Sequence, residues 1–172
     1  MGSRTNKHIF AGIFAFVLAA AVFALGHGND HGQTSAKVGN GTVSVEYHSP
    51  LAKGRDLLSM IKPGSYWRMG ADSATTLTTD VELQLGDTAV PKGEYVLWAH
   101  FTDSENWSLV LATAPSRRQP DPATILVELP GSVSTLSDVV EALTIEVTGN
   151  GSDATLTLEW GTARLTADFT AV

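Results

Sequence analysis

Two arginines and two aromatic residues between Gly54 and Thr76 are the side chains best suited to bind a charged ligand. Arg55 and Arg68 carry guanidinium groups, which bind carboxylates and phosphates through paired hydrogen bonds. The arginines could therefore converge on an anionic ligand, with Tyr66 or Trp67 stacked beside it. This stretch has little regular pattern, and long irregular loops are where binding sites usually lie.

A structural role is the alternative for both arginines. Each could pair with a nearby carboxylate, such as Asp56, Asp72 or Asp80, and so fasten the long loop to the rest of the fold. Asp72 also belongs to the candidate binding residues, beside the two arginines. The sequence leaves both interpretations open.

A predicted β-hairpin carries a second candidate pair, Trp98 and His100. Its strands are expected to pair Phe101 with Trp107, which places one apolar face toward the core. Trp98 and His100 then share the opposite face. They either lie beneath a loop or crossing strand, or form an aromatic platform for a flat or sugar-like ligand.

The sequence contains no recognised catalytic signature. A G-x-S-x-G turn, an H-E-x-x-H pair, a phosphate-binding loop and a dinucleotide motif are all absent. There is no cysteine to act as a nucleophile or bind metal. We therefore predict no catalytic residue, no metal ligand and no cofactor. The alternative is a hydrolase that uses His100 or His48 as its base and a loop Asp or Ser as partner.

These candidate residues must be positioned by β-strands, because apolar side chains recur at every second position after Thr42. The clearest runs are Val43/Val45/Tyr47, Leu77/Val81/Leu83/Leu85, Ile125/Val127/Leu129, Leu143/Ile145/Val147, Leu156/Leu158/Trp160 and Ala163/Leu165/Ala167/Phe169. Strands with one apolar face bury those faces against each other. Residues 42–172 are therefore predicted to form a single all-β domain, a two-layer antiparallel β-sandwich. At most residues 136–141 form one helical turn, and residues 149–153 form a hairpin turn.

The N-terminus has the pattern of an export signal. Arg4 and Lys7 precede an apolar run at residues 9–25, so residues 1–26 are predicted to be a signal peptide with an apolar export helix. A run of this length extends roughly 25 Å as a helix, so an uncleaved membrane anchor is the alternative. Both place the remainder outside the cytoplasm, periplasmic or secreted. Residues 27–41 are small and polar without a period and are predicted to be a flexible tether.

The charge of the chain limits its partners. The formal net charge is −7, and Arg4 and Lys7 precede the apolar run. An acidic domain is a poor partner for nucleic acid or for an anionic lipid surface. Contact with a membrane is expected only through residues 9–25, if they are not removed.

Several motifs resemble the bacterial family known as domain of unknown function 2911. They are Tyr47 with Ser49-Pro50, Gly54-Arg55, Trp67-Arg68-x-Gly70-Ala71, Ala74-Thr75 and Val90-Pro91-Lys92-Gly93-Glu94-Tyr95. The resemblance covers most of the chain from about Val43 onward and implies a secreted bacterial all-β domain. It implies no activity, because none is established for the family. This chain has Met69 and Asp72 where a Thr and an Asn are common in the family.

The sequence as a whole predicts an exported envelope protein that acts as a non-enzymatic binding or structural module. Its partner would be a small ligand or glycan at the loop around Trp67 and Arg68, or another protein along a sheet edge. The hydrolase described above is the alternative function.

Overall fold

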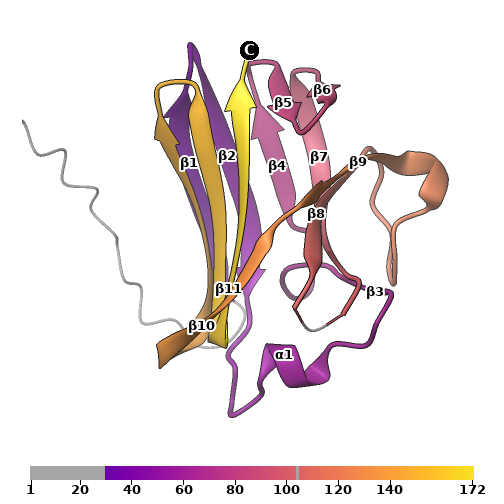
Figure 1. Ribbon diagram of the computed structural model, residues 1–172, viewed down its shortest axis with the longest axis vertical. Helices are drawn as coiled ribbons and strands as arrows, with labels where there is room; N and C mark the ends of the chain where they lie inside the picture. The colour runs from indigo at the N-terminus through magenta and orange to yellow at the C-terminus, as the bar shows by residue number, and fades with distance from the viewer. Residues whose placement is uncertain (1–29, 104) are drawn as a thin grey trace, which may run out of the picture.

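The computed structural model of the protein describes residues 30–103 and 105–172. The predicted export segment, residues 1–26, lies outside this range, as do residues 27–29 of the predicted tether. The described chain is mostly β-structure, and its strands form two antiparallel sheets that pack face to face (Figure 1). The predicted two-layer β-sandwich is confirmed.

The larger sheet has seven strands. Six are adjacent in the order β1 (Asp30–Val38), β2 (Gly41–Ser49), β4 (Thr76–Thr79), β7 (Gly93–Phe101), β8 (Trp107–Ala112) and β9 (Ile125–Pro130). The seventh strand, β3 (Ser65–Trp67), pairs with residues 99–101 of β7. Because β4 pairs with residues 93–96, the two short strands β4 and β3 occupy successive parts of the same side of β7.

The smaller sheet has four strands, in the order β10 (Ser132–Asn150), β11 (Asp153–Ala171), β5 (Leu83–Leu85) and β6 (Thr88–Val90). The two long strands are joined by the predicted hairpin turn, in which Asn150 pairs with Asp153 and Gly151 has a positive φ of 63°. A one-turn helix, α1 (Leu57–Met60), and a 3-10 turn, η1 (Pro122–Thr124), are the helical segments of the described chain.

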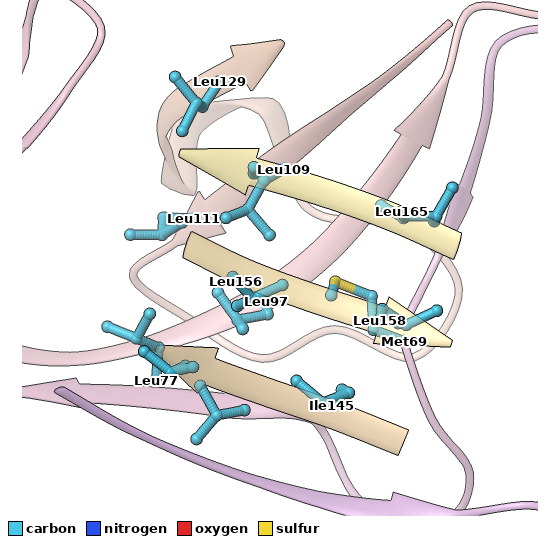
Figure 2. Close-up of a cluster of buried hydrophobic side chains, with 14 of the residues drawn as sticks. Met69, Leu77, Leu97, Leu109, Leu111, Leu129, Ile145, Leu156, Leu158 and Leu165 are labelled. Atoms are coloured by element: carbon cyan, nitrogen blue, oxygen red, sulfur yellow. The ribbon is translucent and has the colours of Figure 1, made fainter. Parts of the chain in front are cut away.

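The core lies between the two sheets, where the alternating apolar side chains meet. They include Leu77, Leu97, Leu109 and Leu111 from the larger sheet and Ile145, Leu156, Leu158 and Leu165 from the smaller one (Figure 2). All of these are buried. Burying one such side chain stabilises the fold by roughly 1.5–3 kcal/mol, so these residues are a main source of the attraction between the two sheets.

The predicted hairpin register is confirmed, because Phe101 pairs with Trp107 across β7 and β8. The face that carries both residues belongs to the main core. The opposite face holds a second, smaller cluster of buried residues: Val96, Trp98, Val110 and Ala112. β7 is therefore apolar on both faces over much of its length, as expected for a central strand that is covered on both sides.

The predicted tether is wrong for most of its length, because residues 30–38 form strand β1 at the edge of the larger sheet. β1 pairs with β2 along its whole length and lies beside β10 of the other sheet (Figure 1). Its side chains are mainly small and polar, and only Val38 is fully buried. An edge strand stabilised mainly by backbone hydrogen bonds leaves little apolar alternation in the sequence.

The predicted helical turn at residues 136–141 is also wrong. These residues belong to β10, whose register with β11 shifts between Thr135 and Val140 and again between Val140 and Thr144. Such bulges insert unpaired residues and bend a strand. They interrupt the two-residue period, which is why this part of the sequence does not show a strand pattern.

Candidate functional site

A pocket of about 540 Å³ is lined mainly by the segment that leads from β2 through α1 and β3. Figure 1 shows this segment at one end of the sandwich. The wall of the pocket is formed by the irregular segment between β2 and β4, including α1 and β3, together with one residue each from β7 and β11. The lining residues are Pro50, Arg55, Leu57, Met60, Ile61, Lys62, Ser65, Tyr66, Trp67, Arg68, Gly70, Ala71, Asp72, Phe101 and Trp160. The pocket thus combines positive, aromatic and aliphatic side chains.

Five of the seven predicted site residues come together in this lining: Arg55, Tyr66, Trp67, Arg68 and Asp72. Tyr66, Trp67 and Arg68 are consecutive, whereas Arg55 precedes them by eleven residues and is separated from them by α1. Asp56 caps α1, since its Oδ1 accepts a hydrogen bond from the Leu58 amide at 3.1 Å. β3 holds Tyr66 and Trp67 in place by pairing with β7.

Arg55 is held by main-chain oxygens and by an aromatic ring. Its Nε–H donates to the Ala52 carbonyl at 2.9 Å, and its Nη2 donates to the Leu51 carbonyl. The guanidinium carbon lies 4.8 Å from the centre of the Trp160 ring, within the range of a cation–π contact. The position of the guanidinium is therefore fixed without a carboxylate.

Arg68 is held in a similar way by the loop that follows it. Its Nη1 donates to the backbone carbonyl of Asp72 at 3.1 Å. The loop itself is anchored by Met69, whose side chain is fully buried in the core (Figure 2) and whose carbonyl accepts a hydrogen bond from Thr75 Oγ1 at 3.0 Å. The Ala71 amide also donates to the His48 carbonyl of β2 at 3.2 Å.

The aromatic part of the pocket is a stacked pair. The rings of Trp67 and Trp160 have centres 5.8 Å apart and are inclined by 17°. Trp160 is buried, and its Nε1–H donates to the Pro50 carbonyl at 2.9 Å. Trp67 is only half-buried, so part of its ring remains exposed at the pocket.

The structural alternative, in which the two arginines pair with carboxylates, is wrong for the described residues. The ion pairs within 4.0 Å among the described residues are His31–Glu46, His100–Glu128 and Arg164–Glu159. Asp56 caps a helix and Asp80 accepts a hydrogen bond from the Thr42 amide, so both carboxylates serve other groups. Within the described chain, most N–H donors of Arg55 and Arg68 have no hydrogen-bond partner.

The other two predicted site residues do not line the pocket. Trp98 is fully buried in the small cluster on the outer face of the larger sheet, where Tyr66, Ala74 and Ile125 pack against it. Of the two positions considered for Trp98, the covered one is therefore confirmed, and Trp98 is not part of an exposed aromatic platform. Its Nε1 has no hydrogen-bond partner among the described residues.

His100 lies on the outer face of the sheet, next to Tyr66. The two rings are stacked, with centres 4.3 Å apart and an inclination of 8°. Glu128 of β9 joins them, because its Oε2 lies 3.0 Å from His100 Nδ1 and its Oε1 accepts a hydrogen bond from the Tyr66 hydroxyl at 3.2 Å. Burial raises the pKa of the Tyr66 phenol above its usual 10.0, and the negative charge and hydrogen bond of Glu128 raise it further.

The partners required by the hydrolase alternative differ from those predicted. The carboxylate beside His100 comes from strand β9 and not from a loop Asp or Ser. His48 contacts the ring of His31, whose centre is 5.6 Å away. No group of three or more His, Asp or Glu side chains in the described chain is placed to hold a metal ion. Nor does any helix in residues 30–103 and 105–172 have the length and hydropathy to cross a membrane.

Sequence reasoning missed Trp160, Lys62 and Phe101 as pocket residues. One signal was available for Trp160. The apolar alternation has a step of three residues between Trp160 and Ala163, and Gly161 has a positive φ of 60° at that break. A Cβ at Gly161 would lie 3.2 Å from the Arg55 carbonyl oxygen, so the irregularity lets β11 approach the pocket loop closely.

Fold and site together define an all-β sandwich domain with a cationic, aromatic pocket at one end. The family model described as protein of unknown function (DUF2911) matches residues 30–169, and the chain belongs to this family. The resemblance predicted from the sequence motifs is thereby confirmed, and no activity is established for the family. Comparisons with curated proteins and with solved structures gave no match.

Proposed function

We propose that this protein is an exported, non-enzymatic binding module that takes a small anionic ligand in the pocket at the end of its sandwich. One observation carries the proposal: Arg55 and Arg68 are both oriented by main-chain carbonyl oxygens, with no carboxylate within ion-pairing distance in the described chain. Their positive charges are therefore not compensated by a partner within the described protein.

The surroundings of the two arginines support an anionic ligand. Lys62 adds a third positive charge to the lining, whereas Asp72 is the one acidic residue of the lining. The chain as a whole carries a net charge of −7, so the pocket lining differs in sign from the average of the molecule. A fixed guanidinium also loses little freedom when it binds a carboxylate or phosphate.

The apolar part of the lining indicates which chemical groups the ligand carries besides its negative charge. Trp67 offers part of its ring, and Met60, another residue of the lining, is 52% exposed. A ligand that combines a negative charge with a ring or another flat apolar group would satisfy both kinds of surface. Export of the domain rests on residues 1–26 and is part of the same proposal.

Binding is favoured over hydrolysis because of where the residues gather. Five predicted residues line one pocket, whereas His100 lies on the outer face with Glu128 as its partner. The contacts of His100 with Tyr66 and Glu128 hold its ring on the outer face, and His100 is not part of the pocket lining.

The test is isothermal titration calorimetry with 2-phenylethyl phosphate and with its neutral counterpart, 2-phenylethanol. The phosphate is expected to bind at least about tenfold more tightly, since hydrogen bonds to charged groups contribute about 1.5–3 kcal/mol each. Arg68→Gln should lose about tenfold in affinity for the phosphate. Arg118→Gln, at an exposed position outside the pocket lining, should bind like the wild type.

Circular dichroism of each variant checks that the fold is intact. The proposal is contradicted if the phosphate does not bind, or if folded Arg68→Gln binds it as tightly as the wild type does. Equal affinity for the alcohol and the phosphate would also contradict it.

A further inference from the structure

Asp72 introduces a negative charge into a pocket whose other charged side chains are positive. Its backbone carbonyl accepts the hydrogen bond from Arg68, but its carboxylate is not within 4.0 Å of a Lys or Arg nitrogen in the described chain. The carboxylate oxygens of Asp72 also accept no hydrogen bond from a described residue. Like the guanidinium groups of Arg55 and Arg68, the Asp72 carboxylate therefore has no oppositely charged partner among the described residues.

The loop holds Asp72 in a left-handed backbone conformation. Asp72 has a φ of 54° and Met69 has a φ of 56°; Asp occupies this region more readily than most residues, whereas Met seldom does. Three contacts impose this conformation: the Arg68 bond to the Asp72 carbonyl, the Ala71 bond to β2 and the buried side chain of Met69. Strained residues of this kind persist where the surrounding structure determines them, and they cluster at binding sites.

Arg68 and the side chain of Asp72 are consequently neighbours in the pocket lining. The two residues are four positions apart, and the hydrogen bond of 3.1 Å from Arg68 Nη1 to the Asp72 backbone carbonyl joins them. An anion attracted by Arg55 and Arg68 would be repelled by the Asp72 carboxylate. A ligand that places a hydrogen-bond donor next to its negative charge would turn that repulsion into an attraction.

We propose that Asp72 selects ligands in which an ammonium or hydroxyl group lies next to the anionic group, as in amino acids and hydroxy acids. This inference rests on the proposed function, because it assigns the anionic group to Arg55 and Arg68. It adds that Asp72 accepts a hydrogen bond from the neighbouring donor. The aromatic or apolar remainder of the ligand lies against Trp67.

The experiment uses three probes that differ in one substituent: L-phenylalanine, 3-phenyllactate and 3-phenylpropionate. They carry an ammonium, a hydroxyl and no donor beside the same carboxylate. Calorimetric titrations of the full domain compare wild type, Asp72→Asn, Arg68→Gln and Asp87→Asn. Asp87 is an exposed aspartate in the turn between β5 and β6, outside the pocket lining, so its variant is the matched control.

Asp72→Asn is expected to fold, because Asn adopts the left-handed region more readily than most residues. The wild type and Asp87→Asn should bind L-phenylalanine at least about tenfold more tightly than 3-phenylpropionate, the size of one charge-assisted hydrogen bond. In Asp72→Asn that preference should fall to about twofold or less. 3-Phenyllactate, if it also binds more tightly than 3-phenylpropionate, should keep this preference in Asp72→Asn, because the Asn amide oxygen still accepts a hydrogen bond from a hydroxyl. That result would identify a hydroxyl as the donor in the ligand.

The inference is overturned if the wild type binds 3-phenylpropionate as tightly as the other two probes. It is also overturned if Asp72→Asn strengthens all three alike, since Asp72 would then only repel anions. In both cases the proposed function survives if Arg68→Gln weakens all three probes. If Arg68→Gln changes none of them, the proposed function fails as well.

Discussion

At the level of single residues, anion binding in the pocket depends on Arg55 and Arg68. Their partners are the carbonyl oxygens of Leu51, Ala52 and Asp72, and these depend on the path of the main chain. A sequence shows which carboxylates exist but not which carbonyls a loop turns toward an arginine. The ion pairs considered for Arg55 and Arg68 were therefore wrong, whereas both arginines line the pocket.

The contact of Tyr66 with Glu128 gives a prediction on proton binding. A raised phenol pKa means that the folded state holds the proton more tightly than the unfolded state does. The stabilisation is therefore fully present below the unfolded pKa near 10 and is lost as the pH rises through the higher folded pKa. Glu128→Gln removes the charge that contributes to the increase. The Tyr66 pKa should fall but stay above its usual value, because burial, the largest cause, remains.

Tyrosinate absorbance measured against pH tests this, with Tyr66→Phe to assign the transition. Tyr95 is an internal control, because burial alone raises the pKa of its phenol and Glu128→Gln should leave it unchanged. A Tyr66 transition that stays in place in folded Glu128→Gln would show that Glu128 does not act on the phenol.

At the level of elements, alternation predicted the strands that face the core and failed where a strand has another source of stability. The β7–β8 register could be predicted because a shift by one residue would place polar and apolar side chains on the same face of the hairpin. β1 has almost no buried apolar residue. Its pairing with β2 comes from backbone hydrogen bonds and from exposed polar contacts such as His31–Glu46 and Lys37–Thr42. Residues 136–141 of β10 lost their period through bulges.

Gly32 tests whether β1 is a packed strand. A Cβ at this position would overlap the ring of Tyr47 on β2. Gly32→Ala is expected to lower the free energy of unfolding by about 1–3 kcal/mol, the usual effect of overpacking a buried contact. Ser35→Ala, at an exposed position on the same strand, should change it by less than about 0.5 kcal/mol.

Urea unfolding followed by tryptophan fluorescence measures both variants. If Gly32→Ala and Ser35→Ala are equally stable, residues 30–38 are not packed against β2. The predicted tether would then describe them better than the edge strand does.

At the level of the whole molecule, the sandwich was predictable and the position of the pocket was not. Two layers follow from strands that each have one apolar face. The pocket depends on Trp160 of the last strand meeting Arg55 and Trp67 of the loop after β2, roughly a hundred residues earlier. No local pattern specifies such a contact. The step of three residues in the alternation after Trp160 marked an irregular site without indicating its partner.

The distribution of charge over the molecule supports the same site. An acidic chain with a net charge of −7 repels anions in general, and a pocket with Arg55, Lys62 and Arg68 attracts them locally. Salt screens such exposed charges over about 10 Å at 0.1 M, so the attraction acts mainly at the pocket. Which anion binds then depends on the orientation in which main-chain carbonyl oxygens hold the guanidinium groups of Arg55 and Arg68.

The most direct test of the account is a nuclear magnetic resonance titration that follows the arginine side-chain Nε–H signals as 2-phenylethyl phosphate is added. The account predicts that the signals of Arg55 and Arg68 shift and saturate together. Those of Arg117, Arg118 and Arg164, which lie outside the pocket lining, should stay in place. Shifts confined to Arg117 and Arg118, or equal shifts at these five of the six arginines, would contradict the claim that this pocket is built to bind an anion.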